Sequence, residues 1–420
     1  MKASFKLDLT CIRQWTREDR PYITGIADGN RFHTALQPIY SLAHRRIVGH
    51  EALVRVFDML GNSISPASIF DREMSNDDMI QLDRLCRWLH LQNFKLIKDP
   101  LNWLFLNVSG QTLARGLEYG SFFKDAIDAA GIPAHRIVIE VVEHPFENPD
   151  WIIPAIRYYK ELGCLIALDD FGAGHSNFDR IWTLKPDIVK LDRSFLTRAN
   201  NNRKIQNLFP GIVSLLHQAG SLVLMEGIET QAQAQALIAI ESDVDFVQGF
   251  YFARPFTDLL SLPPVFDQFP MLMNRYKNER DCTDIQFQDK LVKYRTLFIN
   301  AVGELKKGKA LFNACSELLD DPMVVRCYNI GTNGIQIGNT LVGKHYVSQT
   351  DKRFKPLEDA RSADWFRRHY LRRAITHPGQ IQVTRPYLSI TGAHMCITLS
   401  MKFSNPSGNS VLCCDLMGSW

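Results

Sequence analysis

The chain has 420 residues, of which 45% are hydrophobic and 22% are charged. This length exceeds the usual ceiling for one hydrophobic core, so we expect two soluble domains. Its 48 Lys and Arg residues against 45 Asp and Glu residues give a net charge of +3. An excess this small gives no indication of a nucleic-acid or membrane partner, and we predict neither.

The cysteines and the N-terminal residues bear on the cellular compartment. Nine cysteines, an odd number without a C-x-x-C pair, argue against a disulfide framework and against a zinc ribbon. The first 15 residues lack an apolar core of signal-peptide length, and no apolar run is long enough to span a bilayer. We therefore expect a cytoplasmic protein with reduced thiols and no membrane span.

Eight apolar, strand-like runs occupy the first two-thirds of the chain. They are residues 32–41, 47–54, 103–108, 137–142, 165–170, 187–191, 222–226 and 246–252. Helix-like segments at 76–98, 122–130, 152–162, 204–219 and 231–240 fall between most of them. This alternation predicts a TIM-like (β/α)8 barrel in the α/β class. Only residues 42–46 join the first two runs, which is too short for a parallel crossover, so we expect that pair to be antiparallel.

Polar residues lie within or at the end of these apolar runs. They are Glu51, Asn107, Glu140, Asp169, Asp170, Lys190, Glu226 and Gln248. Taken alone, Glu51 is more typical of a buried ion pair, with Arg55 as its partner. However, the ends of parallel strands meet at the C-terminal mouth of a barrel, so the joint pattern predicts one shared site there.

Seven motifs follow one another in order around these residues. They are QPIY at 37–40 with EALVR at 51–55, FLNVS at 105–109, IEVVE at 139–143, DDFGAGHSNF at 169–178, KPDIVKLDRSF at 185–195, EGIET at 226–230 and QGFYFARP at 248–255. The stretch 32–255 resembles the EAL-domain family of bacterial cyclic-di-GMP phosphodiesterases. The family fold is a barrel with an antiparallel strand among its early strands, which agrees with the short connection at 42–46.

The resemblance implies a site for two Mg²⁺ or Mn²⁺ ions, hard cations that prefer oxygen ligands. One ion would be held by Glu51, Asn107, Glu140 and Asp169, and the second by Asp169 together with Asp170. Glu226 matches the general base or a ligand of metal-bound water, and Lys190 would position the attacking water. The catalytic assignments are therefore Glu226, Lys190 and Glu51.

Further residues match supporting positions of the family. Gln37, Arg55 and Gln248 would contact the nucleotide or its metal-bound waters, while Glu143 and Glu229 would order the nearby loop and waters. Ala173, His175 and Met225 depart from the commonest family residues, but none of them is a ligand. A lone loop histidine such as His175 is more typical of a surface or packing residue. Asp170-Phe171-Gly172 lacks the companion motifs of a kinase.

The composition changes beyond residue 255. A proline-rich stretch at 262–270 ends the barrel, and 284–309 has helical spacing that we interpret as a docked connecting helix. From about residue 320, short strand-like runs surround one helical insertion at 363–375. We therefore expect a barrel domain at 1–262, a connecting segment at 263–318 and a further domain at 319–420.

The region 319–420 resembles an α+β PAS-like or Cache-like sensor domain. Trp365, Arg385, Tyr387 and Asp415 are candidates for a small-molecule pocket, although ordinary core and surface roles are the simpler interpretation. A role in dimerisation without sensing is equally open.

These observations together predict a homodimeric, metal-dependent phosphodiesterase that hydrolyses cyclic-di-GMP to linear pGpG under control of its C-terminal domain. No GGDEF-like stretch is present, so synthesis of the nucleotide is not expected. The alternative is a catalytically silent cyclic-di-GMP receptor or scaffold that signals through the C-terminal domain. Because no metal or base residue of the family pattern is missing, we favour the enzyme.

Overall fold

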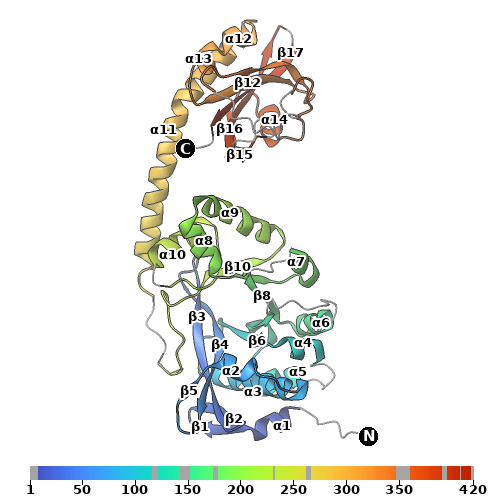
Figure 1. Cartoon of the computed structure of the whole chain (residues 1–420), viewed down its shortest axis with the longest axis vertical. Coiled ribbons are helices and arrows are strands. Elements are labelled where there is room, and N and C mark those ends of the chain that lie inside the picture. The colour runs from blue at the N-terminus through green and yellow to red at the C-terminus, as the bar shows by residue number, and fades with distance from the viewer. Residues whose placement is uncertain are drawn as a thin grey trace. The chain divides into compact units, whose positions relative to one another are not determined.

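The computed structural model describes residues 8–115, 122–141, 152–173, 178–229, 232–261, 266–346, 360–389, 395–406 and 408–417. The chain divides into two compact units, Met1–Lys277 and Asn278–Trp420 (Figure 1). Each unit has its own sheet and its own hydrophobic core. Helix α11 (Phe269–Lys306) contains the division between the two units.

Eight strands of the first unit close into a barrel in the order β3-β11-β10-β9-β8-β7-β6-β4, with β4 returning to β3. Their bounds are β3 Asn30–Ser41, β4 Arg46–Asp58, β6 Trp103–Val108, β7 Ile137–Val141, β8 Leu165–Phe171, β9 Ile188–Leu191, β10 Leu222–Met225 and β11 Phe246–Val247. Strand β3 is antiparallel to both of its neighbours, and the other pairs in the ring are parallel. The predicted barrel with one antiparallel strand is confirmed.

Two features of the sheet differ from the sequence prediction. Strand β11 ends at Val247 instead of residue 252, because the chain turns at Gly249, whose φ is +154°. Short edge strands also extend the barrel sheet: β1 (Thr16–Asp19) and β2 (Tyr22–Ala27) add to β3, and β5 (Ser63–Ile64) adds to β4. These short strands lack the long apolar run that marks the barrel strands.

Helices surround the barrel where the sequence predicts them. Their bounds are α1 Leu9–Gln14, α2 Pro66–Phe70, α3 Asn76–Phe94, α4 Gly110–Arg115, α5 Phe122–Ala130, α6 Ile153–Leu162, α7 Phe178–Leu184, α8 Ser194–Asn201, α9 Arg203–Gln218 and α10 Ala232–Glu241. Ser75 caps the N-terminus of α3, because its hydroxyl accepts a hydrogen bond from the N–H of Asp78. Its Leu82, Leu85 and Leu89 are buried on one face, as predicted. Helices α1, α2, α4, α7 and α8 were not predicted.

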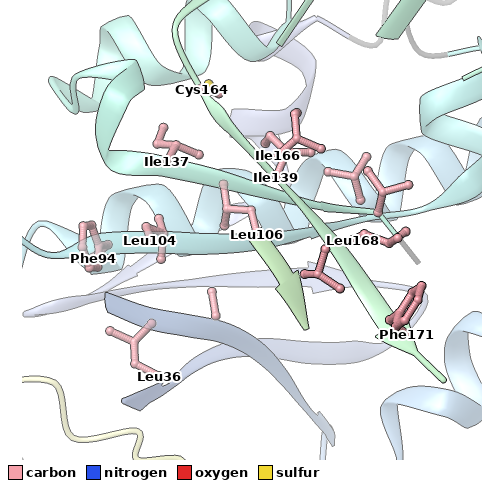
Figure 2. Packing of buried hydrophobic residues seen from close by; sticks show 14 of the residues in the cluster. Leu36, Phe94, Leu104, Leu106, Ile137, Ile139, Cys164, Ile166, Leu168 and Phe171 are labelled. Atoms are coloured by element: carbon pink, nitrogen blue, oxygen red, sulfur yellow. The ribbon is translucent and has the colours of Figure 1, made fainter. Parts of the chain in front are cut away.

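The barrel strands bury both faces, because successive side chains point to opposite sides of a strand. One set packs outward against the surrounding helices and includes Leu104, Leu106, Ile139 and Leu168 (Figure 2). The alternate set forms a smaller, separate cluster that fills the barrel interior. Its members from the parallel strands are Val48, Phe105, Val138, Ala167, Ile188, Leu224 and Phe246. This layer is the floor of the site described below.

The second unit is built on an antiparallel sheet in the order β13-β12-β17-β16-β14, with β15 paired to β16. Its elements are α12 Leu311–Ala314, α13 Ser316–Leu319, β12 Val324–Gly331, β13 Gln336–Val342, α14 His369–Thr376, β14 Gln382–Val383, β15 Tyr387–Leu388, β16 Met395–Asn405 and β17 Gly408–Met417. Leu291 and Phe298 of α11 pack into one core cluster of the sheet. Tyr370 and Leu371 of α14 pack into another cluster, formed by the alternate residues of β12 and β17. Within the described residues, no helix has the length and hydropathy that a membrane span requires.

Candidate functional site

A layer of polar side chains lies directly above the apolar floor of the barrel. On several strands the interior apolar residue is followed, two positions later, by a polar residue, so both side chains point inward and the polar one is nearer the C-terminal end. The pairs are Phe105 with Asn107, Val138 with Glu140, Ala167 with Asp169, Ile188 with Lys190, Leu224 with Glu226 and Phe246 with Gln248. Glu51 reaches the same layer from β4, where it lies opposite Gln37 of β3.

Lys190 is at the centre of this layer and is 1% exposed. Its Nζ lies 2.6 Å from Glu140 Oε1, 2.7 Å from Glu226 Oε1 and 2.9 Å from Asp169 Oδ1. A fourth carboxylate oxygen, Glu51 Oε1, is 3.8 Å away. One ammonium group therefore binds four carboxylates that come from, or directly follow, four different strands.

Both carboxylate oxygens of Glu51 accept hydrogen bonds from neighbouring amides. Asn107 Nδ2 donates to Oε1 at 3.1 Å, and Gln248 Nε2 donates to Oε2 at 2.7 Å. These contacts fix the orientation of the Glu51 side chain from β6 on one side and from the end of β11 on the other.

The excess of carboxylates changes the proton affinity of the groups in the site. Burial raises the pKa of Glu140 well above its ordinary value, and burial with the charges of Asp169 and Glu51 raises the pKa of Glu226 to about 8. Burial and the adjacent Asp169 also raise the pKa of Asp170. For Lys190, burial acts to lower the pKa, but the surrounding carboxylates together raise it well above the usual value. The site therefore favours additional positive charge.

The residues present fit a divalent cation. Asp169, Asp170 and Glu226 each offer a carboxylate oxygen, and these oxygens lie within 4.8 Å of one another. The buried Oε2 of Glu140 has no hydrogen-bond partner among the described residues. The donors are all oxygens, which suits Mg²⁺, Mn²⁺ or Ca²⁺. Of the six predicted ligands, the structure brings three into this close group, while Glu51 and Glu140 lie beside Lys190 and Asn107 donates to Glu51.

Two unusual backbone conformations shape the rim of the site. Asp170 has a φ of +55°, and its N–H donates to Asp169 Oδ1 at 3.1 Å, where the pairing of β8 with β9 shifts register. At Gly249, a Cβ atom would lie 2.2 Å from the carbonyl oxygen of Ile228. The absence of a side chain there lets the chain approach Ile228 directly after Gln248.

A cleft with an empty volume of about 380 Å³ opens beside this cluster and is lined by Gln37, Glu51, Glu226, Glu229, Gln248 and Phe250. Gln37 Nε2 donates to the carbonyl of Ala253 at 3.3 Å. Phe250 is 44% exposed, and the guanidinium of Arg254 lies 4.5 Å from its ring centre. Phe250 was missed by the sequence analysis, because a strand assigned to 246–252 gives no reason for an exposed aromatic.

Other predicted residues lie away from the cluster or outside the described residues. Arg55 is half-buried on the same face of β4 as Glu51 but does not line the cleft. Burial lowers its pKa, and the charge of Glu51 opposes that shift. Glu229 lies 3.8 Å from Arg193 in a largely exposed ion pair. Glu143 and His175 fall outside the described residues.

In the second unit, Trp365 and Tyr387 line a separate cavity. Asp415 is fully buried and is bonded to Arg326, which also lines this cavity. Arg385 is exposed and is not among the lining residues.

The fold and the site define a TIM-like barrel with carboxylates at its C-terminal mouth. The EAL domain family matches residues 24–255, which is more than half of the chain. The chain therefore belongs to the EAL domain family.

Curated relatives match the same part of the chain. The EAL-domain protein YkuI of Bacillus subtilis is 30% identical over 224 residues, covering 52% of this chain and 54% of that protein. The cyclic di-GMP phosphodiesterase NbdA of Pseudomonas aeruginosa is 29% identical over 228 residues, covering 52% of this chain and 28% of that protein. The chain thus spans about half or less of the length of these relatives.

One solved structure is similar over both units. The crystal structure of B. subtilis YkuI, in complex with its substrate cyclic-di-GMP and calcium, covers 93% of this chain and 97% of that chain with a TM-score of 0.76. The sequence identity in this comparison is 21%, so the likeness shows a shared fold.

Proposed function

We propose that this protein is a metal-dependent phosphodiesterase that hydrolyses cyclic-di-GMP to linear pGpG. The observation that carries the proposal is the cluster of four carboxylates around the buried Lys190, beside a cleft at the barrel mouth. Catalytic residues of barrel enzymes come from the C-terminal ends of several strands, as these do.

In this proposal, two Mg²⁺ or Mn²⁺ ions are held by the predicted ligands Glu51, Asn107, Glu140, Asp169, Asp170 and Glu226. When bound, such ions polarise the phosphate and lower the pKa of water. Glu226 is the general base, because it lines the cleft and is hydrogen-bonding distance from Lys190. Lys190 holds the carboxylates together and positions the attacking water.

The cleft residues supply the nucleotide contacts. Gln37 of β3 and Gln248, which follows the adjoining strand β11, offer amide groups, and the exposed ring of Phe250 offers a flat apolar surface suited to a guanine base. Arg55 lies farther along β4, where it suits a part of the ligand away from the reacting phosphate. We retain Glu229 and Glu143 as residues that order waters and the adjacent loop.

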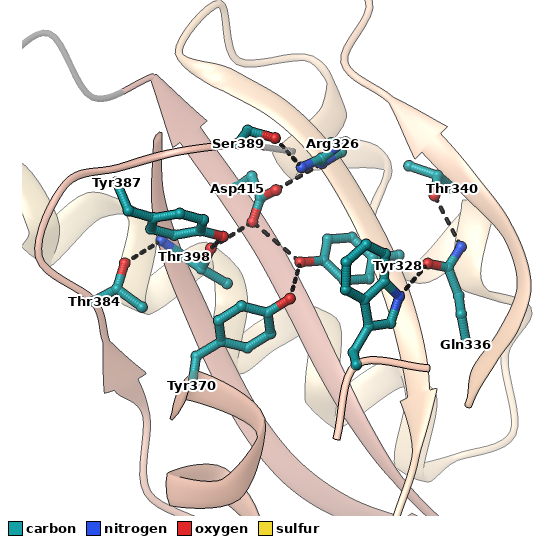
Figure 3. A network of polar contacts seen from close by, with 11 residues as sticks. Arg326, Tyr328, Gln336, Thr340, Tyr370, Thr384, Tyr387, Ser389, Thr398 and Asp415 are labelled. Carbon is teal, nitrogen blue, oxygen red and sulfur yellow. Dashed lines mark hydrogen bonds and ion pairs between the residues drawn. The ribbon is translucent and has the colours of Figure 1, made fainter. Parts of the chain in front are cut away.

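We assign residues 319–420 to a PAS-like or Cache-like regulatory domain, joined to the barrel domain by a connecting segment at 263–318, in a homodimer. The support for this assignment is an antiparallel sheet with α11 against one side and α14 against the other. On the α14 side, polar side chains that include Arg326, Tyr328 and Trp365 line a small cavity (Figure 3).

Turnover of cyclic-di-GMP by the full-length protein in Mg²⁺ or Mn²⁺ tests the enzymatic proposal. We expect pGpG as the product and the loss of turnover in both Glu51→Ala and Glu226→Gln. The matched control is Glu161→Gln, which makes the same change on the exposed side of α6 and should leave the rate unaltered. Binding of cyclic-di-GMP in Ca²⁺ without cleavage in Mg²⁺ or Mn²⁺ would instead establish a receptor and overturn the proposed hydrolysis.

A further inference from the structure

The start of α11 packs against the outer face of the barrel at the place where the ring closes. Strands β3 and β11 pair there, and side chains alternate between the two faces of each strand. On β3, Tyr40 belongs to the core around the barrel, whereas the preceding Ile39 belongs to the interior cluster. Gln37, on the inward-facing side of β3, and Gln248, directly after β11, line the cleft. The outer face of this junction is therefore the back of the wall that carries the two cleft amides.

Five aromatic rings form a cluster on this outer face. They are Tyr40 of β3, Tyr251 and Phe252 of the turn after β11, and Phe266 and Phe269 at the start of α11. The ring centre of Phe266 lies 4.8 Å from those of both Phe252 and Phe269, 5.3 Å from that of Tyr251 and 6.1 Å from that of Tyr40. These distances are typical of favourable aromatic pairs. Phe266 is thus the ring that links α11 to the other members of the aromatic cluster.

The aromatic cluster is held together by packing. Phe252 is 6% exposed, Phe266 is 8% exposed and Phe269 is 2% exposed. The buried hydroxyl of Tyr40 has no hydrogen-bond partner among the described residues, so ring contacts alone hold the end of its side chain. The half-buried Tyr251 adds one polar contact, because its hydroxyl donates to Gln268 Oε1 at 3.4 Å.

A tight turn connects the aromatic cluster to the cleft. The N–H groups of Phe252 and Ala253 both donate to the carbonyl of Gly249, at 3.0 Å and 3.1 Å. Gly249 directly follows Gln248, and the next residue, Phe250, also lines the cleft. A displacement of Phe252 would therefore move both of these cleft residues.

The same turn reaches the carboxylate cluster. Gln248 Nε2 donates to Oε2 of Glu51, a predicted metal ligand, at 2.7 Å. Gln37 Nε2 donates to the carbonyl of Ala253 at 3.3 Å. The orientations of Glu51 and Gln37 thus depend on a turn whose outer side is packed against α11.

We infer that Phe266 and Phe269 are positioning residues for the barrel site, because they hold the turn at 248–253 against the two strands that close the ring. The inference rests on the function proposed above, since it assigns these rings a role in that reaction. It also means that the connecting segment proposed at 263–318 begins within the structure that supports the cleft, and is more than a link between domains.

Amide hydrogen exchange of the full-length protein, measured by mass spectrometry without substrate, tests the positioning role. Phe266→Leu keeps an apolar side chain but removes the ring, and it should speed exchange in peptides that cover 248–256 at least about tenfold. The matched control is Phe123→Leu, which makes the same change in α5. The Phe123 ring is 3% exposed and lies 5.1 Å from that of Tyr159, and its loss should leave exchange at 248–256 unchanged.

Initial rates with cyclic-di-GMP in Mg²⁺ or Mn²⁺ measure the effect on the reaction. Phe266→Leu should lower kcat at least about tenfold and raise KM at least about threefold. Phe269→Leu should change both constants in the same directions, whereas Phe123→Leu should keep both within about twofold of the parent. A smaller folded fraction would lower kcat alone, so the rise in KM separates positioning from general destabilisation.

The inference is wrong if, in both ring variants of the aromatic cluster, either the exchange at 248–256 or KM matches the Phe123→Leu control. A parent protein without turnover would contradict the proposed hydrolysis. The exchange comparison, which needs no substrate, would in that case still support or overturn the positioning of the turn.

Discussion

Lys190 contacts four carboxylates within 3.8 Å in a part of the barrel that is almost closed to solvent. Replacing it with methionine would retain its length but leave the carboxylates facing one another without a cation. We predict that Lys190→Met lowers the free energy of unfolding by about 3–5 kcal/mol at neutral pH in metal-free buffer, the usual cost of breaking a buried ion pair. Urea denaturation measures this change.

The matched control is Lys124→Met, which removes an exposed ion pair between Lys124 and Asp128 on α5. We expect no measurable change in stability for this variant, because exposed pairs are screened by water and salt. Equal effects of the two substitutions would show that the carboxylate cluster does not depend on Lys190.

The buried His90 makes the free energy of unfolding depend on pH. It is buried in α3 with Nδ1 2.9 Å from the Thr34 hydroxyl, and burial with the charge of Arg55 lowers its pKa from 6.5 to about 3. Between these values the unfolded chain binds more protons than the folded one. The contribution of neutral His90 to the free energy of unfolding is thus complete above pH 6.5. It is lost as the pH falls toward 3, by up to about 1.4 kcal/mol per pH unit.

Urea midpoints measured from pH 7 to pH 4 test this pH dependence. His90→Gln should flatten the decline in stability, while His135→Gln, at an exposed position, should leave it unchanged. If His90→Gln declines as steeply as the parent, His90 does not remain neutral in the folded protein.

At the residue scale, the sequence was most informative where a polar residue interrupts an apolar run. Glu140 and Lys190 could be predicted because nothing in a buried strand explains a charged residue there, and both are in the observed cluster. The sequence could not separate the three closely grouped carboxylates from the other predicted ligands. That distinction depends on the backbone at Asp170, a local conformation that no periodic pattern encodes.

At the scale of elements, the turn after β11 determines where Gln248 points. A Cβ at Gly249 would lie 2.2 Å from a backbone oxygen, and the φ of +154° is strained for any L-residue. We predict that Gly249→Ala displaces Gln248 from Glu51 and reduces cyclic-di-GMP turnover about a hundredfold, as a shift of about 1 Å can. Initial rates in Mg²⁺ or Mn²⁺ measure the loss.

The control for this substitution is Gly220→Ala. Gly220 also has a positive φ, of +91°, but a Cβ there meets no atom within 4 Å. We expect it to cost about 1 kcal/mol of stability while the rate stays within about twofold of the parent. A similar loss of rate in both variants would attribute the effect to general strain instead of to the position of Gln248.

The same turn explains why element boundaries were harder to predict than element identities. The apolar run 246–252 continues through Phe250 and Phe252, so hydrophobicity alone extends the strand past its true end at Val247. The edge strands β1 and β5 were missed for the opposite reason, because a short polar strand pairs through its backbone and needs no apolar pattern. The long runs of β6 and β7 match their predicted positions closely.

At the scale of the whole molecule, two units with separate cores predict two unfolding transitions. Phe298→Ala removes a fully buried ring from the core of the second unit and should lower one transition by about 3–5 kcal/mol. Ile299→Ala, at the next position of α11, changes a residue that is 54% exposed and should have little effect.

Scanning calorimetry with cyclic-di-GMP and Ca²⁺ then assigns the other transition. Ligand at about a hundred times its dissociation constant should stabilise the barrel unit by about 2.7 kcal/mol. The temperature of the other transition, the one that Phe298→Ala lowers, should not change. A single transition that responds to both changes would mean that the two units unfold together.

The barrel ring closes between its first strand and its last, and this junction has an unusual construction. Strand β11 pairs with β3 at only two positions, Tyr40 and Ser41, and the next backbone contact is the bridge between Leu36 and Phe256. Gln37 lies in this interval, and it lines the cleft together with Gln248 from the end of β11. The cleft therefore lies where β3 and β11 close the ring. A nucleotide that contacts the side-chain amides of both Gln37 and Gln248 would connect the first and the last strand of the ring. Its binding should therefore slow amide hydrogen exchange along β3 and β11 more than elsewhere in the sheet.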